Sequence, residues 1–175
     1  MSDMVSLLEP LIPALRRYAR SFVKDKSTAD DLVQDTLEHA VSRWHQRRAE
    51  GDARTWVFRI LHNLAIDGLR QAARRGQHLP LDDARESDVA VPSAQEDRLR
   101  QGDILKALSQ LPEDQRSVLL LVSVEDMSYA QVAHVLGVPV GTVMSRLARA
   151  RARLHNLMEN DSTAASGRPQ LRRVK

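Results

Sequence analysis

Residues 128–157 read SYAQVAHVLGVPVGTVMSRLARARARLHNL, and this stretch determines the fold of the C-terminal half. Ser128 followed three residues later by Gln131 has the form of a capping box, in which two side chains satisfy the free amides at a helix start. Gly137 is suited to end that helix, because glycine adopts the left-handed conformation without strain. Pro139 cannot easily continue it. Two short helices joined by a tight glycine turn predict a helix-turn-helix.

The second of these helices is rich in arginine and has no acidic residue before Glu159. Its arginines are Arg146, Arg149, Arg151 and Arg153. Leu147, Ala150 and Leu154 form an apolar stripe on another face, so the helix cannot present all its charge to one partner. A plain structural hairpin is the alternative, but an arginine helix without acids favours insertion into the major groove of DNA.

The N-terminal part predicts three helices. Apolar side chains recur at helical spacing over about 8–22, 27–48 and 54–75. Pro13 lies near the start of the first helix, where a proline is best tolerated. The second helix is expected to begin at Ser27 or Thr28, which places Asp30 and Asp31 in its first turn, near the positive end of the helix dipole.

Two further segments, a linker and a buried helix, lie between the N-terminal helices and the helix-turn-helix. Residues 76–98 carry six acidic and two basic side chains, two prolines and almost no helical periodicity, which indicates a linker. Further on, SVLLLVSV (117–124) is apolar nearly all round and predicts a central buried helix, with a short buried strand as the alternative. Pro112 is expected at the first position of that helix.

The expected fold is therefore all-α, with two small helical domains joined by a flexible acidic linker. The expected boundaries are 1–75 and 98–158 for the domains, 76–97 for the linker and 159–175 for a disordered basic tail.

Composition excludes several classes of protein. The chain has 175 residues, 42% of them apolar but only 3% aromatic, and a net charge of +3. It contains no cysteine, and its six histidines lack the spacing of a metal site, so neither a disulfide framework nor a metal centre is expected. No glycine-rich phosphate loop or carboxylate–histidine cluster indicates an enzyme, a catalytic residue or a cofactor. The N-terminus lacks the pattern of a signal peptide and no segment is long and apolar enough to span a membrane, so we expect a soluble, cytoplasmic protein.

Several motifs together resemble one family. The run from 128 to 151 closely resembles region four of extracytoplasmic-function (ECF) sigma factors, and Leu-Pro-Glu-Asp-Gln-Arg at 111–116 is similar to the lead-in of that region. Ala-Asp-Asp-Leu-Val-Gln-Asp-Thr-Leu at 29–37 resembles the polymerase-binding helix of region two. Thr-Trp-Val-Phe-Arg-Ile-Leu-His-Asn at 55–63 resembles the segment that engages the promoter element nearest the start site. The motifs occur in the family's order, so the resemblance covers about 10–158.

The resemblance implies a partner for the second helix, which in this family docks on core RNA polymerase. The residues that match are Asp31, Gln34, Asp35 and Glu38. The three acids follow one another at i, i+4 and i+7 and form one acidic edge. A merely solvated face is the alternative.

The resemblance also implies two sets of DNA contacts. The positions that match the major-groove contacts of region four are Thr142, Ser145, Arg146 and Arg149. Met144 and Ala148 depart from the family's usual larger or charged residues. The positions expected at the proximal, single-stranded element are Trp56, Asn63, Arg54 and Arg70. Trp56 can stack a base or pack in the core, and the sequence leaves both open.

Membership in this family would make the chain a monomeric subunit that directs RNA polymerase to promoter DNA and is sequestered by an anti-sigma factor. In the family the two promoter elements lie about two turns of DNA apart, roughly 70 Å, a distance that some 20 extended linker residues can span. A stand-alone helix-turn-helix regulator that binds duplex DNA without polymerase is the alternative. Such a regulator is usually a symmetric dimer, and the sequence shows no heptad seam for one.

Overall fold

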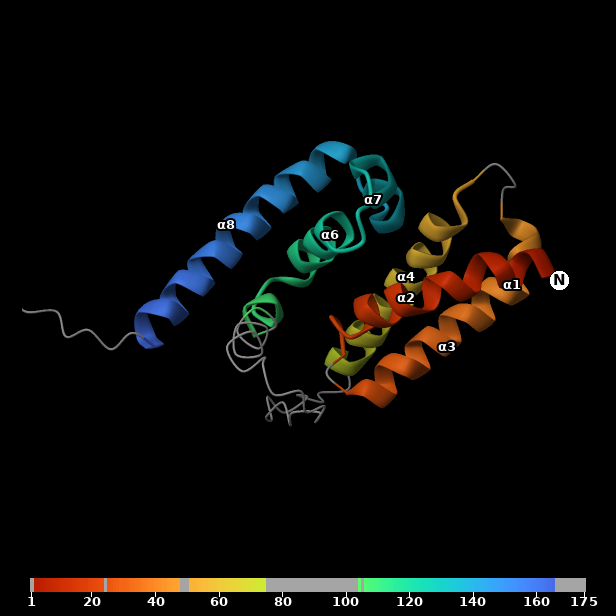
Figure 1. Cartoon of the computed structure of the whole chain (residues 1–175), viewed down its shortest axis with the longest axis horizontal. Coiled ribbons are helices and arrows are strands. Elements are labelled where there is room, and N and C mark those ends of the chain that lie inside the picture. Colours follow the sequence, from red (N-terminus) through yellow and green to blue (C-terminus); the bar gives the residue numbers. More distant parts are fainter. Residues whose placement is uncertain (1, 24, 48–50, 75–103, 105, 166–175) are drawn as a thin grey trace, which may run out of the picture.

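The computed structural model describes residues 2–23, 25–47, 51–74, 104 and 106–165 (Figure 1). Every regular element within these residues is helical, which confirms the all-α prediction. The predicted linker, 76–97, lies outside them. In chain order the elements are α1 (Ser2–Leu8), the 3-10 helix η1 (Glu9–Leu11), α2 (Ile12–Ala19), α3 (Lys26–Ser42), the 3-10 helix η2 (Trp44–Gln46), α4 (Ala53–Arg74), α6 (Glu113–Ser123), α7 (Tyr129–Leu136) and α8 (Val140–Ala165).

Helices α1 to α4 form an N-terminal module in which α2, α3 and α4 pack on one another. Leu15 and Tyr18 of α2 and Phe58 and Leu61 of α4 are almost completely buried. The Tyr18 ring meets Phe22 edge to face, with 5.0 Å between ring centroids, and lies 5.6 Å from Phe58. Each large apolar side chain buried in this way contributes about 1.5–3 kcal/mol, so this cluster holds the module together.

In place of the predicted first helix over about 8–22, three helical pieces follow one another from Ser2 to Ala19, namely α1, η1 and α2. Pro10 lies in the first turn of η1 and Pro13 in the first turn of α2. Proline lacks an amide hydrogen and is tolerated at a helix start, so each proline is found where a new helical segment begins.

The predicted bounds of the second helix were wrong at both ends. Helix α3 begins at Lys26 because Asp25 is its N-cap: the Asp25 Oδ2 accepts a hydrogen bond from the Thr28 amide at 2.7 Å. As a result no acidic residue lies in its first turn. The helix ends at Ser42 instead of near 48, and η2 follows.

Helices α6 to α8 form a C-terminal module that confirms the predicted helix-turn-helix. Both hydrogen bonds of the capping box are present between Ser128 and Gln131. Gly137 ends α7 in the left-handed region, at φ 66° and ψ 36°. The segment 117–124 is α-helical up to Ser123, so the strand alternative is wrong. Pro112 is extended and precedes α6 as its N-cap residue, one position earlier than predicted.

Two features of the C-terminal half differ from expectation. Helix α8 runs to Ala165, so residues 159–165 of the predicted disordered tail are helical. In addition, α7 packs against α4 (Figure 1). The buried apolar side chains of both modules belong to one continuous cluster. The two modules therefore contact each other directly in this structure.

Candidate nucleic-acid and protein interfaces

Helix α8 has one buried and one exposed face. Val143, Leu147 and Ala150 are buried, and Leu154 is half-buried, in contact with the core. Helices α6 and α7 both pack against α8. The predicted core-facing stripe is thereby confirmed, and the opposite face of α8 is directed outward.

Two of the four predicted groove-facing side chains, Ser145 and Arg149, are exposed on the outward face. The Arg149 Nε donates to the Ser145 carbonyl oxygen at 3.2 Å, which holds the guanidinium along the helix. Thr142 is half-buried. Arg146 is only 26% exposed, and its Nε lies 3.2 Å from the Oδ2 of Asp114 on α6. Arg146 is therefore tied to its own module, whereas Arg149 is available to a ligand.

Helix α3 exposes the predicted acidic edge. Ala29, Val33 and Ala40 are buried against the rest of the module. On the outer face all four side chains of the predicted polymerase-binding set are exposed: Asp31, Gln34, Asp35 and Glu38. The structure thus places them together on one accessible surface.

Trp56 occupies an intermediate position between the two alternatives that the sequence left open. It is half-buried and packs edge to face on Trp44, with 6.0 Å between ring centroids. It also lines a cavity of about 630 Å³ between α4 and α7, together with Gln46, Arg47, Gly51, Asp52, Thr55, Arg59, Ala130, Gln131 and His134. Asn63 and Arg70 are exposed further along α4, where Arg70 pairs loosely with Asp67 at 3.8 Å.

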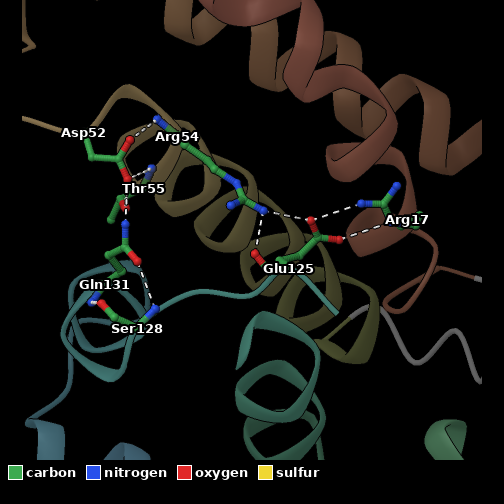
Figure 2. A network of polar contacts seen from close by, with 7 residues as sticks. All are labelled: Arg17, Asp52, Arg54, Thr55, Glu125, Ser128 and Gln131. Atoms are coloured by element: carbon green, nitrogen blue, oxygen red, sulfur yellow. Dashed lines mark hydrogen bonds and ion pairs between the residues drawn. The ribbon is translucent and has the colours of Figure 1, made fainter. Parts of the chain in front are cut away.

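Arg54 lies in a network that joins the two modules (Figure 2). Its Nη2 donates to the backbone oxygen of Glu125 at 2.6 Å and to the Glu125 Oε2 at 3.2 Å. Arg17 of α2 binds the same carboxylate, through its Nε at 3.3 Å and its Nη2 at 3.2 Å. Glu125 is only 2% exposed. One buried carboxylate of the C-terminal module is therefore held between two arginines of the N-terminal module.

A second polar contact crosses between the modules beside the first. Gln131 donates from its Nε2 to the Asp52 Oδ2 at 3.0 Å (Figure 2). Partial burial opposes the ionisation of Asp52, but hydrogen bonds from Thr55, Arg54 and Gln131 outweigh it and hold the pKa of Asp52 below its usual value. The ionised form of this carboxylate, which accepts all these bonds, is therefore favoured.

Sequence reasoning missed both contacts. Arg17 and Glu125 are 108 positions apart, and no local pattern pairs them. The one available signal is the position of Glu125, which together with Asp126 follows an apolar helix and precedes the capping box.

Comparisons with known proteins agree on one family. Residues 101–154 match the family model described as Sigma-70, region 4, and residues 8–62 match the Sigma2 domain of PhyR. The chain is 33% identical over 156 residues to the ECF RNA polymerase sigma factor EcfG of Rhodopseudomonas palustris, covering 89% of this chain and 85% of the relative. The chain belongs to the ECF RNA polymerase sigma factors. It directs the initiation of transcription.

A further relative and two solved structures support the same family. This sigma factor is 36% identical over 144 residues to SigM of Mycobacterium tuberculosis, covering 82% of this chain and 71% of the relative. Its structure resembles the sigma factor RpoE of Bartonella quintana, solved in complex with the anti-sigma factor NepR, with a TM-score of 0.76, 34% identity and coverage of 91% and 98%. It also resembles CnrH, solved in complex with the cytosolic domain of CnrY, with a TM-score of 0.69, 29% identity and coverage of 90% and 88%.

An aromatic and histidine cluster lies beneath the contact between the sigma factor's modules. The Tyr18 hydroxyl and the His62 Nδ1 are 3.1 Å apart. Burial, and after it the positive charges of Arg146 and Arg70, lower the pKa of His62 to about 4. Arg116 of α6 lies over the Phe22 ring, 5.8 Å from its centroid. Charges of the C-terminal module thus act on side chains of the N-terminal one.

Within the part of the chain that the structure describes, no helix combines the length and the apolar character needed to cross a membrane.

Proposed function

We propose that this sigma factor acts through binding alone, with three surfaces that have separate tasks. The acidic edge of α3 docks on core RNA polymerase, the outward face of α8 reads the distal promoter element as duplex, and the region around α4 binds the melted strand of the proximal element. We assign the polymerase and proximal-element surfaces to the module 1–75 and the distal-element surface to the module 98–158, with residues 76–97 as the linker between them. The observation that carries the proposal is the exposure of Arg149 and Ser145 on a helix whose opposite face is fixed in the core.

The duplex contact follows from the geometry of the helix-turn-helix. A recognition helix inserts its N-terminal part into the major groove, and an arginine there can bind a guanine edge or a phosphate. Ser145 and Arg149 lie one turn apart near the start of α8, and their side chains are exposed. Arg146 serves mainly to orient α8 on α6, because Asp114 holds its guanidinium. Thr142 is half-buried at the helix start, and its amide is bonded to the Pro139 carbonyl oxygen at 2.9 Å, so its hydroxyl is the group proposed to contact DNA.

The strand contact is proposed for Trp56, Asn63, Arg70 and Arg54. The Trp56 ring packs edge to face on Trp44 and also lines the cavity. The contact with Trp44 restricts the ring, so that an unpaired base can stack on it. Asn63 can bind a base edge, and the exposed guanidinium of Arg70 can bind phosphate.

The polymerase contact is proposed for α3. Asp31, Asp35 and Glu38 form a negative edge, and such an edge fixes orientation and speeds encounter with a positively charged partner. An anti-sigma factor is proposed as a further partner, because two of the most similar structures, those of RpoE and CnrH, were solved with NepR and with CnrY.

A promoter-binding experiment tests the α8 assignment. In vitro transcription with core polymerase first maps a start site, and a labelled duplex from its upstream region is then the probe. We expect Arg149→Ala to weaken the holoenzyme–duplex complex by about 1–3 kcal/mol, roughly tenfold to a hundredfold. Arg151→Ala, an equal loss of charge on another face of the same helix, is the control and stays close to wild type. Equal loss in both variants would contradict the assignment, because it would indicate general electrostatics.

A pull-down with core polymerase tests the α3 assignment. Asp35→Ala is expected to reduce the retained sigma factor while leaving its helical content unchanged, since the side chain is exposed. Glu9→Ala removes an exposed acid elsewhere in the same module and is the control. Normal retention of the Asp35→Ala protein would show that the docking surface lies elsewhere.

A further inference from the structure

The outward face of α8 carries an apolar edge near its start. Val140 and Met144 lie four residues apart, one turn above the other on the same side of the helix. Their side chains are 43% and 54% exposed, and among the residues that the structure describes no large apolar side chain is more exposed than Met144. A single exposed apolar residue is ordinary on a protein surface. Two in neighbouring turns form a continuous apolar edge.

This edge adjoins the proposed duplex contact. With 3.6 residues in each turn, Met144 and Arg149 flank the outward face of α8, and Ser145 lies between them. Val143 and Leu147, from the same turns, are buried in the core of the module. Because they fix the rotation of α8, Met144 stays exposed in the free protein and keeps a constant position relative to Arg149.

The charges around the apolar edge indicate what kind of surface covers it. The exposed arginines of α8 are Arg149, Arg151 and Arg153, and no acidic residue occurs from 140 to 158. A matching surface has negative charge around a small apolar group. The major groove of DNA has this character, because phosphates border it and the C5-methyl group of thymine projects into it. Methionine suits such a contact, since its unbranched thioether adapts to the shape of its partner.

We propose that Met144 is a specificity-determining residue, which binds the C5-methyl group of a thymine in the distal promoter element, with Val140 at the flank of the contact. The inference rests on the proposed function of α8 and deepens it by naming a base that α8 reads. Adenine, guanine and cytosine present donors or acceptors in the groove but no methyl group. Such a polar group would be buried against the thioether without a partner, so the site selects thymine.

Deoxyuridine isolates this contact, because it pairs as thymine does and lacks only the C5-methyl group. The probes are duplexes from the upstream region of the mapped start site, each with one thymine replaced by deoxyuridine. We expect the wild-type holoenzyme to bind about fourfold more weakly when the contacted thymine is replaced, the effect of losing one buried carbon group. Met144→Ala should weaken binding to the unmodified duplex and should abolish the sensitivity to deoxyuridine at that position.

Two further variants and a control separate the apolar contact from a general effect. Met144→Leu should keep the sensitivity to deoxyuridine, whereas Met144→Gln, which is similar in length but polar, should lose it. The side chain is exposed, so circular dichroism should show unchanged helical content in all three Met144 variants. Met158→Ala is the control, because it makes the same substitution about four turns further along α8 and should bind every duplex as wild type does.

Three results would overturn the proposal. The wild-type holoenzyme could be insensitive to deoxyuridine at every position, or Met144→Ala could keep the full sensitivity, which would assign the effect to the shape of the DNA. Met144→Ala could also bind every duplex as wild type does, which would direct the apolar edge to a protein. In these cases Arg149→Ala still weakens binding to all duplexes if the α8 assignment holds. Failure of that assignment is distinguishable, because Arg149→Ala would then bind them as wild type does.

Discussion

Gly137→Ala provides the sharpest test of the turn on which the helix-turn-helix depends. Gly137 has φ 66° and ψ 36°, and a methyl group added there would meet no atom within 4 Å. The cost therefore comes from the backbone alone, about 1–2 kcal/mol for an alanine in the left-handed region. Alanine also lowers the entropy of the unfolded chain, which offsets about 0.4–1 kcal/mol of this. We expect a net loss of about 1 kcal/mol.

Gly68→Ala is the matched control with the opposite sign. Gly68 lies within α4, and a methyl group there would also meet no atom within 4 Å. In a helix interior alanine is favoured over glycine by about 0.8–1.0 kcal/mol. The same chemical change should thus destabilise the protein at residue 137 and stabilise it at residue 68.

Urea unfolding followed by circular dichroism measures both effects, and the two variants should differ by about 2 kcal/mol. Gly137→Asn should recover part of the loss, because asparagine tolerates the left-handed region. A Gly137→Ala protein as stable as wild type would refute the reasoning from φ. A shift of both alanine variants in the same direction would refute it as well.

Two further predictions concern local contacts. Ser128→Ala removes the capping hydroxyl of α7 and is expected to cost about 0.5–2 kcal/mol; Ser123→Ala, at the exposed end of α6, should change the free energy of unfolding by less than about 0.5 kcal/mol. For His62, the pKa is 6.5 when unfolded and about 4 in the folded protein, so between these pH values the unfolded chain binds more protons. The free energy of unfolding should therefore fall as the pH is lowered through this window, by at most about 1.4 kcal/mol per pH unit. In urea unfolding at several pH values, His62→Gln should show a smaller dependence on pH. An unchanged dependence would contradict the assignment to His62.

The helix-turn-helix was predictable because everything that defines it is local. Ser128, Gln131 and Gly137 lie within ten residues, and each acts on the backbone of its neighbours. The buried stripe of α8 follows from helical spacing alone. The exposure of the acidic edge on α3 was likewise implied once the opposite stripe was assigned to the core.

Helix ends were less predictable where two residues could act as the cap. Ser27 and Thr28 both suit an N-cap, but Asp25 takes that role and binds the Thr28 amide and hydroxyl instead. Asp25 has the extended backbone of an N-cap, at φ −77° and ψ 131°. Three neighbouring residues with side chains that suit an N-cap leave the choice among them open in the sequence.

The contact between the modules was not predictable, since each of its residues has an ordinary local explanation. Gln131 belongs to a capping box, and Arg54 looks like one of several basic residues near a nucleic-acid surface. Only the fold reveals that Gln131 also binds Asp52, and that Arg54 faces a buried acid instead of solvent. Long-range pairing of this kind requires coordinates.

The polar character of this contact bears on how readily the modules can part. A purely apolar interface would be stabilised in proportion to the area removed from water, and its separation would expose all of that area. At Glu125 the attraction of two guanidinium groups is largely offset by the cost of removing the charges from water, so these ion pairs add little net stability to a contact whose buried apolar side chains already form one cluster. Closure is nevertheless specific, because a misplaced partner would leave the carboxylate buried and unpaired.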